Sequence, residues 1–219
     1  MQENVVVVVA GGVPLRPDVA VLVPENARVF AADGGVAHAL ALGLRVEAVI
    51  GDLDSAAQAD LDEAAAAGAR IDRHPVAKDA TDLELALEEA VALDPQRIVV
   101  LAEAGGRLDH LLSLLLLFGS ARFAEPRLDA QVGRALVHVI RDERSLAGEP
   151  GELVSLLPLH GPARGVRTEG LVYPLADETL EPGSSRGVSN VFAVGEARVS
   201  LASGVLLAVR PGAEEGETK

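Results

Sequence analysis

The sequence predicts an N-terminal doubly wound, mainly parallel α/β domain followed by a small antiparallel β domain, a sandwich or barrel. Two observations support this division. In residues 1–120, short apolar runs alternate with segments of helical periodicity, whereas after about residue 125 only strand-like runs separated by Gly or Pro remain. Strands that are apolar throughout are typical of a parallel sheet with helices on both faces.

The elements of the first half follow from local pattern. Brief apolar runs bounded by turn or polar residues predict strands at residues 5–10, 28–32, 47–50 and 98–102. Helical segments are predicted between them, at residues 36–42, 56–67 and 81–93. In the last segment the apolar residues recur every three to four positions, so they form one face of a helix.

The second half has a different texture. Residues 135–141, 152–157, 188–194 and 205–209 are strand-like, and no convincing helix is visible. We therefore expect residues 1–128 to form the α/β domain and residues 129–211 the β domain. The polar residues 212–219 are expected to be a disordered tail.

Composition excludes several classes of function. The formal net charge is −14, and no basic stripe is available to neutralise nucleic-acid phosphates. The absence of Cys excludes disulfides, thiolate metal sites and Cys nucleophiles. The apolar runs are too short for a signal peptide or a membrane span, so we expect a cytoplasmic protein that binds neither membrane nor nucleic acid.

Four polar clusters lie at strand ends or helix starts, which is where open parallel sheets bind ligands. Asp33 with Gly34 and Gly35 follows the second predicted strand. The other clusters are residues 51–55 after the third strand, residues 78–82 before a helix, and residues 105–110 after the last strand.

Asp52 and Asp54 are two residues apart, so in an extended segment both carboxylates can face one cation. Ser55 and Gln58 could form a capping box directly after them. The alternative is that both aspartates are ordinary turn residues. Gly51 favours a ligand site slightly, because it permits close approach of the backbone.

Lys78 precedes a predicted helix start, where a cation is unfavourable unless an anion lies between it and the free N–H groups. Thr81 with Glu84 forms a second possible capping box, which also accounts for Asp82 in the first turn. A solvated Lys78 paired with Asp79 is an equally acceptable interpretation of this cluster alone.

Gly105, Gly106 and Arg107 before a helix supply backbone N–H donors and a guanidinium, a suitable cradle for phosphate. A GG turn before a helix is common, and the sequence has no Walker loop. Asp109 could be an early-helix carboxylate, and His110 a histidine beside the core. Taken together, the carboxylates and basic groups are the parts that Mg²⁺-dependent phosphoryl transfer requires.

The chain resembles the thiamine pyrophosphokinase family through both halves. The matching motifs are ADGG (32–35), GDLDS (51–55), KDATDLELAL (78–87), GGRLDH (105–110), TEGLVYPL (168–175) and RGVSN (186–190). The resemblance implies transfer of a diphosphate group from ATP to the hydroxyl of thiamine, with AMP as the leaving group. Each motif alone is weak, but six in this order form a specific signal.

The resemblance also implies roles for residues of the first half. Asp52, Asp54 and Asp82 would hold Mg²⁺. Lys78 and Arg107 would neutralise the phosphates, and Asp109 would orient or deprotonate the thiamine hydroxyl. The catalytic group is therefore Asp54, Lys78, Arg107 and Asp109, and the nucleotide-binding group is Asp33, Gly34, Gly35, Lys78, Asp79, Thr81 and Arg107.

In the second half, the resemblance implies that Ser189 and Asn190 contact thiamine, and that two copies of the chain form a homodimer with the active site at the subunit interface. Some family members stack an aromatic ring on thiamine just after this pair; Phe192 is the nearby aromatic, and the chain has no Trp. Two alternatives remain open: a pyrophosphokinase for another hydroxymethyl heterocycle such as a pterin, and a non-catalytic nucleotide- or thiamine-binding protein.

Overall fold

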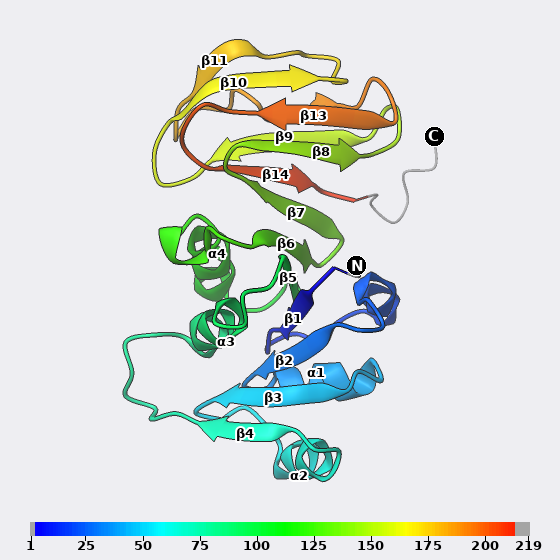
Figure 1. The fold of residues 1–219 in the computed structure, drawn as a ribbon, viewed down its shortest axis with the longest axis vertical. Helices are drawn as coiled ribbons and strands as arrows, with labels where there is room; N and C mark the ends of the chain where they lie inside the picture. The colour runs from blue at the N-terminus through cyan, green and yellow to red at the C-terminus, as the bar shows by residue number, and fades with distance from the viewer. Residues whose placement is uncertain (1–2, 213–219) are drawn as a thin grey trace. The chain divides into compact units, whose positions relative to one another are not determined.

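The computed structural model describes residues 3–212, and the chain divides into two compact units (Figure 1). The first unit ends at Gly133 and the second begins at Arg134. This division comes slightly later than residue 128, because the strand β6 (Arg127–Val132) pairs with β5 (Arg97–Ala102) of the first unit. Residues 213–219 of the expected tail lie outside the described part.

The first unit is built on a parallel sheet. Its strand order is β6-β5-β1-β2-β3-β4, and every neighbouring pair is parallel. The further strands are β1 (Val5–Val9), β2 (Arg28–Ala32), β3 (Val46–Gly51) and β4 (Arg70–Arg73). The chain runs outward from β1 to β4 and then returns to place β5 on the other side of β1. The strand order therefore reverses between β1 and β5, the position where doubly wound sheets bind ligands.

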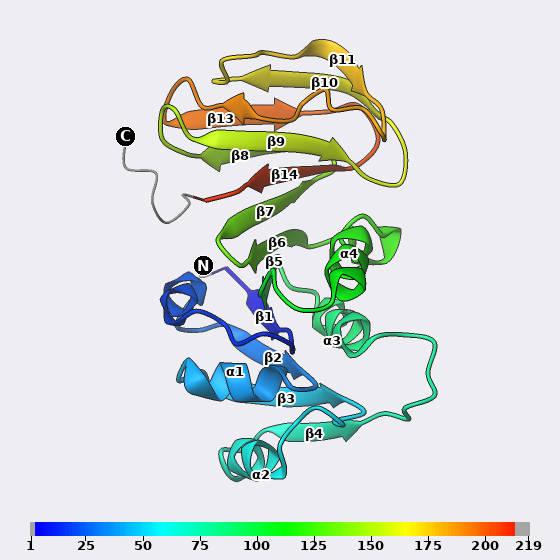
Figure 2. The same ribbon diagram turned by 180° about the vertical axis from the view of Figure 1, so that it is seen from behind.

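Helices cover both faces of this sheet. They are α1 (Gly35–Ala41), α2 (Gln58–Ala66), α3 (Asp82–Val91) and α4 (Leu108–Leu117), with short 3-10 helices at Pro17–Leu22 and Ala121–Phe123. Figures 1 and 2 show α1 and α2 on one side of the strands and α3 and α4 on the other. Alternate residues of β1 share one buried cluster with residues of α1 and α2. The sheet is thus buried on both faces, as its apolar strands predict.

The second unit is an antiparallel β-sandwich. One sheet has the order β7-β14-β9-β12 and the other β8-β13-β10-β11. The strands are β7 (Ala135–Ile140), β8 (Glu143–Ala147), β9 (Leu153–Pro158), β10 (Ala163–Glu169), β11 (Ala176–Leu180), β12 (Asn190–Val191), β13 (Glu196–Ser200) and β14 (Leu206–Arg210). Apolar residues from both sheets share one buried cluster, so the predicted fold class is confirmed and the sandwich is the form it takes.

The sequence missed the strands with few apolar residues. In β13 every second residue is buried, and in β10 the buried residues Ala163, Val166 and Thr168 are separated by polar or glycine residues, so neither segment forms a continuous apolar run. β4 contains one apolar residue, Ile71. In β6 the buried Asp129 pairs with Arg97, with Oδ2 2.6 Å from Nε, so a strand at the first unit's edge carries a buried charge.

Among the described residues, no helix is long and apolar enough to cross a bilayer.

Candidate active site at the carboxyl edge of the parallel sheet

A cavity of about 500 Å³ lies beyond the carboxyl ends of β1, β2 and β5. Its lining comes from residues 10–13 after β1, Asp33 after β2, residues 81–83 at the start of α3, and residues 103 and 105–107 after β5. One side of α4 completes it. The cavity therefore occupies the place where the strand order reverses, and its volume is that of a small-molecule site.

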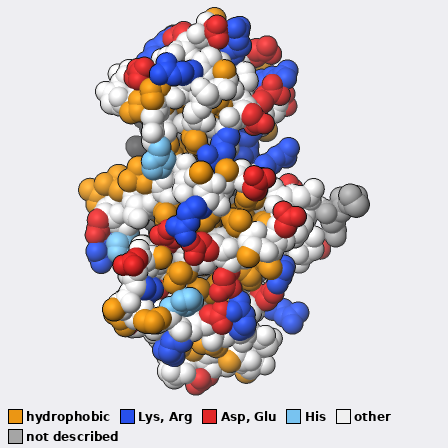
Figure 3. All heavy atoms as spheres, turned by 60° about the vertical axis from the view of Figure 1, so that its left-hand side comes forward, with side chains coloured by type: hydrophobic (Ala, Val, Ile, Leu, Met, Phe, Trp, Pro, Cys, Tyr) orange, Lys and Arg blue, Asp and Glu red, His pale blue; other side chains and the backbone are white. Residues whose placement is uncertain are grey.

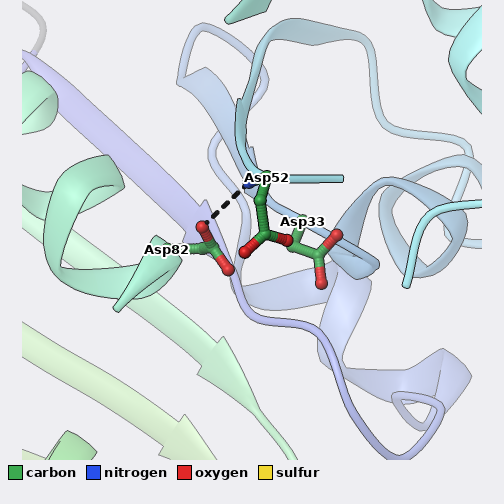
Figure 4. A group of neighbouring side chains, drawn as sticks. All are labelled: Asp33, Asp52 and Asp82. Atoms are coloured by element: carbon green, nitrogen blue, oxygen red, sulfur yellow. Dashed lines mark hydrogen bonds between the residues drawn. The ribbon is translucent and has the colours of Figure 1, made fainter. Parts of the chain in front are cut away.

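Three aspartates converge beside this cavity. Asp33 follows β2, Asp52 follows β3, and Asp82 opens α3, and one carboxylate oxygen of each lies within 4.8 Å of the others (Figure 4). The Asp52 N–H donates a hydrogen bond of 3.1 Å to Asp82 Oδ1. The group thus joins three segments that are distant in the sequence, and its oxygens are the ligands that Mg²⁺ prefers.

The backbone before Asp52 is shaped for this approach. Gly51 has φ +147°, and a Cβ at this position would lie 2.7 Å from Asp82 Oδ1. Leu53 has φ +62° although it is buried in the core. A bulky residue at positive φ is strained, and such strain persists only where packing holds it in place. The turn 51–53 therefore fixes Asp52 next to Asp82.

Lys78 lies on this acidic group. Its Nζ is 2.6 Å from Asp52 Oδ2 and 3.0 Å from Asp82 Oδ1, and all three side chains are largely buried. The hydrogen bond from Lys78 lowers the pKa of Asp52. Burial lowers the pKa of Lys78, but its hydrogen bonds to both aspartates outweigh this and raise it. Lys78 thus stays charged and balances part of the negative charge.

Asp33 has a different environment. Burial raises the pKa of Asp33, and this outweighs the hydrogen bonds that it accepts from Gly34 and Ser55. The Ser55 N–H lies 3.3 Å from Asp33 Oδ1. Asp33 also has φ +47°, which turns its side chain toward the group. The carboxylate is therefore held where its charge is costly unless a cation is nearby.

Asp54, which was predicted to hold Mg²⁺ with Asp52 and Asp82, does not belong to the group of three. It is exposed, and its carboxylate accepts a 3.0 Å hydrogen bond from the Ser55 hydroxyl. The predicted capping box of Ser55 with Gln58 is wrong, because α2 begins at Gln58 with Ala57 as its N-cap and has no side-chain cap. Ser55 instead joins Asp54 and Asp33.

The second predicted cap is confirmed. Thr81 is the N-cap of α3 and accepts a hydrogen bond from the Glu84 N–H at 3.2 Å. Only half of the capping box forms, because the Glu84 carboxylate pairs with Arg122. Thr81 lines the cavity, whereas Asp79 is exposed and outside its lining.

Gly34 and Gly35 lie at the start of α1, outside the cavity lining. A Cβ at Gly35 would collide with the Val9 carbonyl, so this glycine lets α1 pack against β1. Packing therefore explains why position 35 is a glycine. The expected contact of Gly34 and Gly35 with the nucleotide stays a prediction.

Arg107 and Asp109 form an exposed pair at the start of α4, with Nη2 2.6 Å from Oδ2. The Arg107 guanidinium, chiefly through its hydrogen bonds, lowers the pKa of Asp109 to about 2. Arg107 lines the cavity and Asp109 does not. A carboxylate with so low a pKa is a weak base near neutral pH, so it is poorly suited to take the proton from a hydroxyl group.

In the second unit, Ser189 is exposed with φ +55°, and its N–H donates to Ser155 Oγ at 3.0 Å. The side chain of Asn190 is buried and binds the backbone of Tyr173, accepting from its N–H at 3.1 Å and donating to its carbonyl at 2.7 Å. Asn190 therefore holds the turn in which Ser189 is presented.

Phe192 departs from the sequence-based expectation. Its side chain is 1% exposed and lies in the core of the sandwich, where it is packed closely against Gly148. Its ring thus has no free face for stacking on a ligand, and the aromatic residue exposed near this turn is Tyr173 at 58%. The sequence could not separate the two, because both follow strand-like apolar residues.

Sequence reasoning also missed part of the cavity. Gly11, Gly12 and Val13 after β1, and Glu103 after β5, line it. The position of each directly after a predicted strand was the available signal. Asp33 was predicted as a nucleotide contact, and the structure adds it to the acidic group.

The fold and this edge define a doubly wound α/β protein with a group of three converging carboxylates beside a small-molecule cavity, an arrangement found in metal-dependent phosphoryl- and diphosphoryl-transfer enzymes. Two family models narrow the class. "Thiamin pyrophosphokinase, catalytic domain" matches residues 20–128, and "Thiamin pyrophosphokinase, vitamin B1 binding domain" matches residues 137–206. The chain belongs to the thiamin pyrophosphokinase family.

Known proteins agree with this assignment. The chain is 27% identical over 206 residues to a thiamine pyrophosphokinase of Bacillus subtilis, covering 93% of this chain and 96% of that protein. The crystal structure of a Bacillus subtilis thiamine pyrophosphokinase has a TM-score of 0.85 at 24% identity and covers 96% of this chain and 100% of that one. For the thiamin pyrophosphokinase from Candida albicans the TM-score is 0.80 at 13% identity, with 95% and 89% covered.

Proposed function

We propose that this chain transfers the diphosphate group of ATP to the hydroxyl of thiamine, giving thiamine diphosphate and AMP. The observation that carries the proposal is the group of Asp33, Asp52 and Asp82 beside the cavity of about 500 Å³, in a chain of the thiamin pyrophosphokinase family. The thiamine oxygen forms a bond to the β-phosphorus. The bond from that phosphorus to the oxygen shared with the α-phosphorus breaks, AMP leaves with this oxygen, and the hydroxyl proton passes to water.

The aspartates fit Mg²⁺. Their oxygens converge within 4.8 Å, and two or three carboxylates suffice because Mg²⁺ keeps several waters and phosphate ligands. We assign Asp52 and Asp82 as ligands together with Asp33, and Asp54 adjoins them with an exposed carboxylate that can turn toward the same ion. Bound there, Mg²⁺ would neutralise charge on the phosphates.

The basic groups of the site would bind the phosphates. Lys78 is held between Asp52 and Asp82, so its ammonium lies next to any phosphate that reaches the ion. Arg107 follows Gly105 and Gly106, and all three line the cavity. Positioning of this kind, together with charge neutralisation, supplies most of the rate in phosphoryl-type transfer.

Nucleotide contacts are assigned to Asp33, Gly34, Gly35, Asp79 and Thr81 along with the two basic residues. Thr81 has the strongest support, because it lines the cavity at the N-terminus of α3. Asp79 is exposed and would act only on the outer part of the nucleotide.

Asp109 would orient the thiamine hydroxyl. Its pKa of about 2 keeps the carboxylate ionised, so it can accept a hydrogen bond but is a poor acceptor of the proton itself. We therefore assign Asp109 as an orienting group, and the proton of the thiamine hydroxyl passes to water.

On the acceptor side we keep Ser189, which is exposed, and Asn190, which holds its turn through Tyr173. Phe192 is buried and is left out of the contact surface. We also propose the homodimer implied by the family, with the active site shared between two copies. Dilution to monomers should then abolish activity, and an active monomer would reject the shared site. The cytoplasmic location stays a prediction.

A metal-dependent enzyme of this acidity should not bind nucleic acid. The net charge is −14, and on the face drawn in Figure 3 the described Lys and Arg side chains are interspersed with Asp and Glu. A continuous positive surface is what phosphate backbones need.

The test is product analysis. The purified chain is incubated with thiamine, ATP and Mg²⁺, and the products are separated by chromatography. Thiamine diphosphate and AMP in equal amounts are expected. ADP with thiamine monophosphate would overturn attack at the β-phosphorus, and no product with thiamine but turnover with a hydroxymethyl pterin would overturn the acceptor.

A further inference from the structure

Glu103 is a carboxylate that the proposed reaction does not use. It follows β5 directly and lines the cavity, next to the point where the strand order reverses. Its Oε1 is buried and has no hydrogen-bond partner among the described residues. Its other oxygen, Oε2, would lie 3.4 Å from a Cβ at position 133, where the chain has Gly133 with φ +57°.

A buried carboxylate oxygen without a partner is costly. Leaving such a group unsatisfied destabilises the folded protein, and does so more strongly when the group is charged. Unsatisfied buried groups are rare in native proteins, and those at functional sites are often completed by a ligand. The torsion that carries the two oxygens of a glutamate is broad, so a small rotation can turn either oxygen toward the cavity.

The charge of Glu103 limits what it can meet. A carboxylate repels phosphate, so it marks a part of the cavity that the phosphates do not occupy. Its counterpart is a hydrogen-bond donor on a part of the substrate that carries no phosphate. Such donors are the ribose hydroxyls and amino group of ATP and the amino group of thiamine.

Glu103 is also distinct from the acidic group. It is not among the aspartates whose oxygens converge within 4.8 Å, and it comes from β5, whereas those residues follow β2 and β3 and open α3. Its role is therefore separate from holding the ion.

We propose that Glu103 is a specificity residue, which accepts a hydrogen bond from a hydroxyl or amino group of the substrate bound in this cavity. This inference rests on the proposed function. A good hydrogen bond to a charged acceptor contributes about 1.5–3 kcal/mol, which corresponds to at least a tenfold change in affinity.

The experiment compares Glu103→Ala and Glu103→Gln with the wild-type chain. Binding of α,β-methylene-ATP and of thiamine is measured separately by calorimetry in the presence of Mg²⁺, and melting temperature is measured without ligand. The control is Glu125→Gln, an exposed glutamate outside the cavity lining. Glu103→Gln retains one acceptor oxygen and removes the charge.

We expect Glu103→Ala to weaken one of the two ligands about tenfold or more, and Glu103→Gln to weaken it less. Without ligand, Glu103→Ala should melt at the same or a higher temperature, because the unpaired oxygen is removed. Glu103→Gln should melt close to wild type, because an amide takes the place of the carboxylate. A structural role predicts the opposite, a lower melting temperature with unchanged affinity, and that result would overturn the inference. Affinities for both ligands within twofold of wild type would overturn it as well.

Two further arms locate the donor. If Glu103→Ala loses affinity only for the nucleotide, the 2′-deoxy, 3′-deoxy and inosine forms of the analogue are tested next. The form that lacks the donor should bind to the wild-type chain and to Glu103→Ala with equal affinity. A loss confined to thiamine assigns the donor to its amino group. Failure of the proposed function would be seen independently, as a wild-type chain that binds neither ligand or forms no thiamine diphosphate.

Discussion

Two cation–carboxylate contacts at the edge of the same sheet differ in how firmly the protein holds them. The side chains of Lys78 and Asp52 are 14% and 11% exposed, whereas those of Arg107 and Asp109 are 69% and 63% exposed. The first contact joins two separate segments, and the second joins residues two apart in one turn. Charges in the interior interact more strongly than charges in water, so the Lys78–Asp52 contact is the stronger of the two and the exposed Arg107–Asp109 contact is weakened by solvent.

The largest effect is expected at the buried contact. Asp82→Asn should lower kcat/KM by on the order of 10²-fold or more, because it removes a carboxylate from the group that would hold Mg²⁺. Asp54→Asn should cost only about tenfold, because its side chain lies outside that group. Both are measured as kcat/KM and as Mn²⁺ affinity. A near-normal Asp82→Asn would remove the acidic group from the mechanism, and equal losses would add Asp54 to the ligands.

An intermediate effect is expected at Lys78. Its ammonium shares oxygens of Asp52 and Asp82 with any cation that binds there. Lys78→Met should therefore bind Mn²⁺ alone about tenfold more tightly, while its affinity for α,β-methylene-ATP falls about tenfold. Calorimetry measures both, with Arg45→Met as an exposed control that also removes one positive charge. Unchanged Mn²⁺ affinity would show that the ammonium and the cation do not compete.

The smallest effect is expected at the exposed contact. Asp109→Asn should reduce the rate about threefold, through loss of one hydrogen bond to the hydroxyl. The loss should be the same from pH 6 to pH 9. The reason is the sign of the shift: the pKa of Asp109 is lowered to about 2, so the carboxylate is ionised throughout this range.

The lowered pKa of Asp109 also determines how the contribution of the Arg107–Asp109 contact to stability depends on pH. The contribution is present above the ordinary pKa of an aspartate and is lost only as the pH falls toward about 2. A loss in Asp109→Asn that changes with pH between 6 and 9 would indicate that Asp109 titrates there, and would return it to the role of a general base. Arg107→Gln serves as the companion variant, because Arg107 is the main cause of the low pKa.

The sequence by itself determined the architecture of both halves. Continuous apolar runs such as residues 5–9 can only be buried on two faces, so they predicted the parallel sheet and its helices. The sequence also indicated which polar clusters lie at the carboxyl edge, because three of the four follow a predicted strand and the fourth precedes a predicted helix. Strands such as β10 and β13 escaped prediction, since residues facing water along one side leave no apolar run.

The tertiary structure decided which of these polar residues meet. Asp52 and Asp54 are equivalent in sequence pattern, but the positive φ of Leu53 holds Asp52 in the acidic group and leaves Asp54 outside. Asp33 joins the group because β2, which precedes it, lies next to β3 in the sheet. This contact depends on the strand order. Phe192, expected beside thiamine, is likewise buried, because side-chain direction in the sandwich turns it into the core and leaves Tyr173 exposed. Local pattern specifies elements, whereas contacts between distant segments depend on packing and backbone conformation, which no short window of sequence contains.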